Sequence, residues 1–180
     1  MTQFIPNAVI VADNDIQMRG LIRSVLTHAR LQVFQAVNGT EAVELARQFR
    51  PGLILLDIAM PNGNGMEACK AIRSLPDYAE VPIVMLTGYA HPRLVAAARQ
   101  LGVNDFITKP FRPNALLARI TGFVAIPPHL LASNLSDGTP DLAANSIQWE
   151  RPPPSGGPAG DNPELAKARE IMRIVRAVQR

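Results

Sequence analysis

The sequence predicts an α/β fold in which a five-stranded parallel sheet carries helices on both faces. Three observations lead to this prediction. Short apolar runs alternate five times with segments of helical periodicity, the central run has four apolar residues in succession, and 47% of the 180 residues are hydrophobic. A run that is apolar at every position is typical of a strand buried on both faces, and therefore of a parallel sheet.

Five apolar runs predict the strands, at 8–12, 31–36, 53–56, 81–86 and 105–108. The run at 53–56 has the sequence LILL and ends at a carboxylate, Asp57. A loop rich in turn residues follows it. The alternation of elements does not by itself fix the order of the strands in the sheet.

Five segments with apolar residues at helical spacing predict the helices, at 16–29, between Thr40 and Pro51, at 66–75, at 92–101 and at 112–124. Thr40 is a plausible N-cap of the second helix, and Pro51-Gly52 is expected to end that unit before the central strand. Pro76 stops the third helix, and Gly102 ends the fourth.

Polar residues stand where four of the predicted strands end. Asp13 with Asn14 follows the first strand, Asp57 the third, Thr87 the fourth and Lys109 the fifth. Because the carboxyl ends of parallel strands meet at one edge of the sheet, these side chains should converge there. They supply oxygen ligands for a hard cation, a nucleophilic carboxylate, a hydroxyl donor and a fixed positive charge, which together suit phosphoryl transfer.

With these residues in place, the sequence resembles the receiver domains of bacterial two-component response regulators, the family of the chemotaxis response regulator. The motifs VADND with Arg19, LLDIAMPNGNGME, MLTGYA and FITKPF occur in the family's order and spacing, and the resemblance covers residues 6–124. It implies the flavodoxin-like (βα)5 receiver fold, for which the strand order 2-1-3-4-5 is known. It also implies a cis bond between Lys109 and Pro110.

The resemblance implies a role for each site residue. Asp57 resembles the phosphoacceptor, which takes a phosphoryl group from a histidine kinase, a phosphotransfer protein or a small acyl phosphate. Lys109 resembles the residue that pairs with the phosphate oxygens, Thr87 the switch hydroxyl, and Phe106 the aromatic side chain that moves with it. The implied cofactor is Mg²⁺, with ligands from Asp13, Asn14, Asp57 and the main-chain carbonyl of Ala59.

The family's acidic pair appears here as Asp13-Asn14. A missing carboxylate should weaken Mg²⁺ binding, because a charge pair at contact is worth several kcal/mol at an effective dielectric near 20. It should also reduce the like-charge repulsion that raises the pKa of Asp57. Asp15 stands one place later, and this offset turns its side chain in another direction. We therefore expect a receiver that is phosphorylated but binds metal weakly, and the alternative is a receiver that signals without phosphorylation.

The sequence Asp13-Asn14-Asp15 also permits a haloacid-dehalogenase-like phosphatase, a class that uses a DxD motif after its first strand. Gln17 stands where that motif has Thr or Val, and Asp57 would have no role in such an enzyme. The sequence therefore predicts a binding protein controlled by phosphorylation. It is not expected to be an enzyme with turnover, although it would assist its own phosphorylation and dephosphorylation.

The composition divides the chain into a receiver domain at 1–124, a linker rich in Pro and Gly at 125–162 and a basic amphipathic helix at 163–180. The linker contains apolar residues that allow a short extra helix, namely Leu130, Leu131 and Leu135. The C-terminal helix needs a partner for its apolar face, which is its own receiver, a second copy in a homodimer or another protein, with an anionic membrane or nucleic acid as remaining options.

One cysteine and the lack of a long apolar segment predict a cytoplasmic protein with no membrane span, and the net charge of +3 is too weak to argue nucleic-acid binding by the main domain. The tail is too short and too proline-broken for a helix-turn-helix DNA-binding domain. We predict a single-domain response regulator that binds a downstream protein target through the face formed by 92–101, 105–108 and 112–124. The alternative is a phosphorylation-independent adaptor or oligomerising protein that acts through its C-terminal helix.

Overall fold

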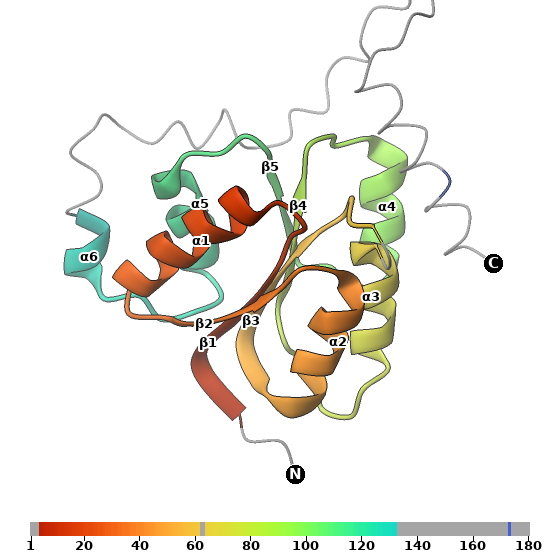
Figure 1. The fold of residues 1–180 in the computed structure, drawn as a ribbon, viewed down its shortest axis with the longest axis horizontal. Helices are drawn as coiled ribbons and strands as arrows, with labels where there is room; N and C mark the ends of the chain where they lie inside the picture. Colours follow the sequence, from red (N-terminus) through yellow and green to blue (C-terminus); the bar gives the residue numbers. More distant parts are fainter. Residues whose placement is uncertain (1–3, 62–63, 133–172, 174–180) are drawn as a thin grey trace, which may run out of the picture.

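The computed structural model describes residues 4–61, 64–132 and 173. Its centre is a parallel sheet of five strands in the order β2-β1-β3-β4-β5 (Figure 1). The strands are β1 Phe4–Ala12, β2 Gln32–Ala36, β3 Arg50–Asp57, β4 Ile83–Thr87 and β5 Asp105–Thr108. The predicted fold class and strand order are confirmed.

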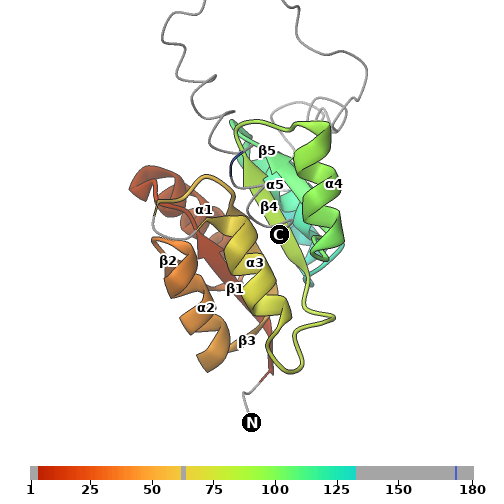
Figure 2. The ribbon, with the colours of Figure 1, turned by 90° about the vertical axis from the view of Figure 1, so that its right-hand side faces the viewer.

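Helices cover both faces of the sheet (Figure 1). They are α1 Ile16–His28, α2 Gly39–Gln48, α3 Gly65–Arg73, α4 Pro92–Gln100 and α5 Pro113–Ile120. Helices α1 and α5 pack on one face, and α2, α3 and α4 follow one another across the other (Figure 2). Because side chains alternate along a strand, Leu53 and Leu55 of β3 enter the core beneath α1 and α5, whereas Ile54 and Leu56 enter the core beneath α2–α4.

The cap of α2 differs from the prediction. Its N-cap is Asn38 and not Thr40, which lies inside the helix. Asn38 Oδ1 accepts a hydrogen bond of 2.8 Å from the Glu41 amide, and Glu41 Oε2 accepts one of 2.9 Å from the Val37 amide. These two hydrogen bonds satisfy two backbone donors at the start of the helix. Thr40, two residues further along, lies inside the helix and cannot cap it in this way.

The amino-terminal edge of the sheet extends further than the apolar runs indicated. Pro51 and Gly52, which were predicted to end the second unit, lie within β3, where Pro51 is paired with Ile5 of β1. β1 accordingly begins at Phe4 instead of residue 8 and has an irregular register between Ile5 and Val9. A Cβ atom at Gly52 would lie 2.1 Å from the Pro6 carbonyl oxygen, so glycine is required for this close approach.

The other boundaries differ by a few residues. β4 begins at Ile83 and α5 ends at Ile120, before the turn at Thr121 and Gly122. A short helix, α6, spans Pro128–Ala132 and buries part of Leu131 against the core beneath α1 and α5. The short extra helix allowed by the sequence is therefore present.

Several predictions for the tail fall outside the described residues. These are Leu135, the linker beyond residue 132 and the C-terminal helix at 163–180, apart from Arg173, whose backbone is helical. Within the described part of the chain, no helix is both long enough and apolar enough to cross a membrane.

Candidate functional site

The polar residues that end the strands meet at the carboxyl edge of the sheet. They form a pocket of about 410 Å³, and its lining consists of Asp13, Asn14, Asp15, Met18, Asp57, Ala59, Gly88, Tyr89, Lys109 and Pro110. The two buried carboxylates come from the ends of different strands, Asp13 directly after β1 and Asp57 as the last residue of β3. Neighbouring parallel strands thus bring together residues that are far apart in the sequence.

Lys109 connects the two carboxylates. Its Nζ atom lies 2.5 Å from Asp13 Oδ2 and 2.9 Å from Asp57 Oδ2. The Asp13 side chain is fully buried, and that of Lys109 is only 17% exposed. One ammonium group cannot neutralise two ionised carboxylates, so the site keeps an excess of negative charge that favours a further cation.

The Asp57 carboxyl has a raised pKa. Burial is the largest cause, and the charge of Asp13 adds to it, whereas the charge and hydrogen bond of Lys109 and the Ala59 amide act in the opposite direction. That amide donates a hydrogen bond of 3.3 Å to Asp57 Oδ1. The ionised form of Asp57 is therefore costly in the protein alone, and a bound cation would stabilise it.

Asp13 is held by the start of α1. Its Oδ1 atom accepts a hydrogen bond of 2.9 Å from the Asp15 amide, and Arg19 Nη1 donates one of 2.7 Å to its carbonyl. Asp15 itself is the exposed N-cap of α1, with Oδ1 accepting from the amides of Gln17 and Met18. This contact engages the Asp15 carboxylate with the first turn of α1, although the residue also lines the pocket, and Asn14 is exposed at the pocket rim.

Thr87 and Phe106 lie next to the pocket but do not line it. Thr87 is 1% exposed, and its Oγ1 atom donates a hydrogen bond of 2.8 Å to the Tyr89 carbonyl and accepts one of 3.0 Å from the Tyr89 amide. Phe106 is buried in the core beneath α2–α4. The Thr87 hydroxyl is thus engaged with the loop that follows β4 and not with Asp57.

The loops around Asp57 and Lys109 have special backbone geometry. The Lys109-Pro110 bond is cis, as the resemblance implied. At the start of α3, a Cβ atom on Gly65 would lie 2.2 Å from the Asp57 carbonyl oxygen, and Asn64 Oδ1 caps the helix by accepting from the Glu67 amide. The first turn of α3 therefore rests directly on the backbone of the candidate phosphoacceptor.

Sequence reasoning missed three residues that line the pocket: Met18, Gly88 and Pro110. Met18 lines the pocket because it lies in the first turn of α1, next to the ends of the strands. A periodic pattern does not predict the rotation of a helix accurately enough to place one such side chain. Pro110 lines the pocket beside Lys109, which it follows in the chain. No local pattern distinguishes Gly88 from any other glycine in a turn.

The donor set fits a hard cation such as Mg²⁺. Two carboxylates, Asp13 and Asp57, line one open pocket together with the backbone at Ala59, and oxygen ligands of this kind are those that Mg²⁺ prefers. The excess negative charge points in the same direction. Asn14 contributes an amide oxygen at the rim without a charge.

Comparisons with known proteins identify the family of this chain. The family model named response regulator receiver domain matches residues 9–121. The DNA-binding response regulator MtrA of Mycobacterium tuberculosis strain H37Rv is 34% identical over 112 residues, 62% of this chain and 48% of that protein. The chain thus spans about half the length of this relative. A 14.6 kDa protein encoded in the sodA1 3′ region of Leptolyngbya boryana is 35% identical over 121 residues, which are 67% of this chain and 92% of that one.

Solved structures give the same result. The chemotaxis protein CheY4 of Vibrio cholerae has a TM-score of 0.63 and 31% identity, and the match covers 65% of this chain and 98% of that one. The receiver domain of sensor histidine kinase PA1611 from Pseudomonas aeruginosa PAO1, with magnesium coordinated in its active-site cleft, has a TM-score of 0.60 and 26% identity, over 64% and 95%. The chain belongs to the family of response regulator receiver domains of two-component signalling.

Proposed function

We propose that Asp57 accepts a phosphoryl group from the phosphohistidine of a histidine kinase or phosphotransfer protein, and that the modified receiver changes its interactions with a downstream protein. The observation that carries this proposal is the position of the Asp57 carboxylate, which lies in an open pocket within 2.9 Å of the Lys109 ammonium. The haloacid-dehalogenase alternative does not suit this arrangement, because Asp15 caps a helix and Asp57 occupies the centre of the site.

In the proposed reaction, an ionised Asp57 oxygen attacks phosphorus while the bond from phosphorus to the donor imidazole breaks. The product is an aspartyl phosphate, and the imidazole takes up a proton from solvent. Lys109, already beside Asp57 Oδ2, pairs with the incoming phosphate oxygens. When bound, Mg²⁺ supplies charge neutralisation, with Asp13, Asn14, Asp57 and the Ala59 carbonyl as its ligands.

In the proposed conformational change after phosphorylation, the Thr87 hydroxyl is the first group to change its hydrogen-bond partner. To donate to a phosphoryl oxygen, Thr87 must give up the hydrogen bond that its hydroxyl donates to the Tyr89 carbonyl. A charge-assisted bond is about twice as strong as a neutral one, so this exchange favours the phosphorylated arrangement. The loop from Thr87 leads into α4, and we propose the α4–β5–α5 face as the surface that partners bind.

A cytoplasmic location, a role without turnover and the possible homodimer stay predictions.

Phosphorylation is tested by the intact mass of the full chain after incubation with acetyl phosphate, with and without Mg²⁺. We expect a Mg²⁺-dependent gain of one phosphoryl group, which is lost in Asp57→Ala. The matched control is Asp77→Asn, because Asp77 is an exposed acid outside the pocket whose positive φ of 66° asparagine tolerates. No gain at any Mg²⁺ concentration would instead favour the phosphorylation-independent adaptor, and a gain that persists in Asp57→Ala would exclude Asp57 as the acceptor.

Asn14→Asp should bind Mg²⁺ about tenfold more tightly, equivalent to about 1.4 kcal/mol. The restored carboxylate adds Coulomb attraction, and the exposure of Asn14 limits that attraction to part of its contact value. Calorimetric titration of the full chain with MgCl₂ measures the change. Asp15→Asn keeps the helix cap and should leave the affinity unchanged. Equal affinity of Asn14→Asp and the parent chain would refute the weak-site hypothesis.

A further inference from the structure

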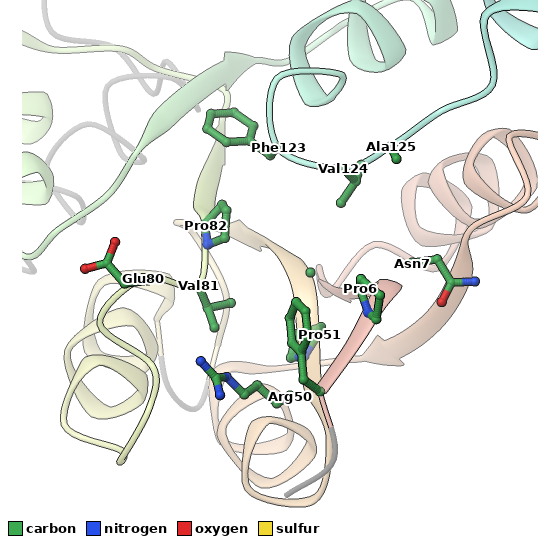
Figure 3. A pocket seen from close by; sticks show the side chains of 12 residues that line it. Pro6, Asn7, Arg50, Pro51, Glu80, Val81, Pro82, Phe123, Val124 and Ala125 are labelled. Carbon is green, nitrogen blue, oxygen red and sulfur yellow. The ribbon is translucent and has the colours of Figure 1, made fainter.

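A second cavity, of about 390 Å³, lies at the amino-terminal ends of β1 and β3 (Figure 3). The Asp57 pocket lies at the carboxyl ends of the strands. Three prolines, two phenylalanines and two valines dominate its walls. The lining comes from the start of β1, the start of β3, the loop before β4 and the segment between α5 and α6, and consists of Phe4, Pro6, Asn7, Arg50, Pro51, Gly52, Glu80, Val81, Pro82, Phe123, Val124 and Ala125. Its size suits a single aromatic side chain with its neighbours.

Two features of this cavity call for an occupant. Phe4 is 51% exposed at the wall of the cavity, so an occupant would remove apolar surface from water. Arg50 Nε is buried and has no hydrogen-bond partner among the residues that the structure describes. Its guanidinium instead lies over the Phe4 ring, with 5.4 Å between the guanidinium carbon and the ring centroid. A buried donor without an acceptor costs about 1–3 kcal/mol, so a shift of Arg50 toward an acceptor in the cavity would stabilise the protein.

The charges at the cavity define the chemistry of the occupant. Arg50 provides the positive charge, and Glu80 provides a negative one further along the rim, across the loop before β4 (Figure 3). No ion pair joins these two side chains among the described residues, and the charge of Glu80 interacts with Arg73. A matching ligand therefore carries an apolar ring, then a carboxylate for Arg50, then a cation for Glu80.

We propose that the segment Trp149-Glu150-Arg151 of the same chain occupies this cavity. The Trp149 indole enters between the prolines and Phe123, the Glu150 carboxylate pairs with the Arg50 guanidinium, and Arg151 faces Glu80. The segment presents the ring, the anion and the cation in successive residues, and Trp149 is the only tryptophan of the chain. It lies outside the described residues.

The length of chain favours this occupant over a second copy. The last described element before the segment, α6, ends at Ala132, and the connection from α5 to α6 itself lines the cavity at Ala125. At about 3.3 Å per extended residue, the chain from Ala132 to Trp149 reaches farther than the domain is wide. A tethered segment acts at an effective concentration near millimolar, which a second copy of the protein does not reach in dilute solution.

The fluorescence of Trp149 tests the proposal on the full chain. We expect the emission maximum to lie at shorter wavelength than in the guanidinium-unfolded chain, and quenching by acrylamide to be several-fold weaker. Both signals should be independent of protein concentration. Phe4→Ala removes a half-exposed wall of the cavity without opening the core, and it should increase quenching while circular dichroism stays unchanged.

Charge exchange provides the specific control. Glu150→Arg lies in the tail, so it leaves the receiver intact, and it should increase quenching of Trp149. Arg50→Glu should have the same effect, and the double variant Arg50→Glu/Glu150→Arg should restore protection at least in part. Glu164→Arg makes the same change of charge elsewhere in the tail and should have no effect.

Three results would overturn the proposal. Emission and quenching equal to those of the unfolded chain would show that Trp149 is exposed. Protection that appears only at high protein concentration would assign the cavity to a second copy. Protection that is insensitive to Phe4→Ala and to both charge variants would place Trp149 at another site. Because none of these readouts requires phosphorylation, failure of the proposed function would leave the test unaffected.

Discussion

Arg73→Met should lower the free energy of unfolding by about 3 kcal/mol or more. Arg73 at the end of α3 donates to the carbonyls of Tyr78, Val81 and Gly102 at 2.6–2.7 Å, and Nη2 also contacts Asn104 Oδ1 at 3.1 Å. One side chain thus connects the loop before β4 to the loop before β5. Each net hydrogen bond contributes about 1 kcal/mol, and methionine would leave three carbonyls without this donor.

Urea unfolding followed by circular dichroism measures this change as a lower midpoint with an unchanged slope. Arg99→Met is the matched control, because Arg99 is an exposed arginine of α4, and its loss should change the free energy of unfolding by no more than about 0.5 kcal/mol. Arg73→Lys should fall between the two, since a lysine keeps the charge but has fewer donors. Equal stability of Arg73→Met and Arg99→Met would show that the three carbonyls find other donors.

Gly65→Ala should destabilise the protein by about 3 kcal/mol or more and reduce phosphorylation several-fold. The added Cβ atom would lie 2.2 Å from the Asp57 carbonyl oxygen, which is far inside van der Waals contact. The backbone fixes the position of the Cβ atom, and the oxygen is itself a backbone atom, so no side-chain rotation relieves the contact and α3 must move away from the end of β3. The movement would displace Ile58 and Ala59, which follow the phosphoacceptor.

Unfolding midpoints and the acetyl phosphate mass assay measure the two effects. Gly20→Ala is the control, because Gly20 is an exposed glycine inside α1 with no atom near the added Cβ. Alanine there should stabilise the protein by about 0.5–1 kcal/mol through its higher helix propensity. The crowding argument fails if Gly65→Ala behaves like Gly20→Ala in either assay.

The parts of the fold that could be predicted are those where burial dominates. Leu53 to Leu56 are fully buried, so their apolar run marks β3 correctly. The run does not predict that β3 includes Arg50 to Gly52, because main-chain pairing with Phe4 and Ile5 at the amino-terminal ends of β1 and β3 does not require an apolar run. The cap of α2 was misplaced for a related reason: Asn38 and Thr40 are both good caps, and only the contact of Glu41 with the Val37 amide decides between them.

The candidate site was predicted in its composition but not in its contacts. Strand ends could be read from the sequence, so Asp13, Asp57 and Lys109 were placed at one edge correctly. The position of the Thr87 hydroxyl could not, because it depends on the path of two backbone groups of Tyr89. The cavity near Arg50 was also missed, since its lining comes from four separate segments.

Because Lys109 contacts both Asp13 and Asp57, a ligand that binds at one of these acids affects binding at the other. Asp13 is fully buried, and Lys109 is its cationic partner. A ligand that draws the ammonium toward Asp57 must therefore weaken its hold on Asp13, and Asp13 then attracts any other cation more strongly. The dependence is reciprocal, because a coupling free energy between two binding events has the same value in whichever order they occur. An anion at Asp57 and a cation at Asp13 should thus bind with positive cooperativity, with a single lysine side chain transmitting the effect.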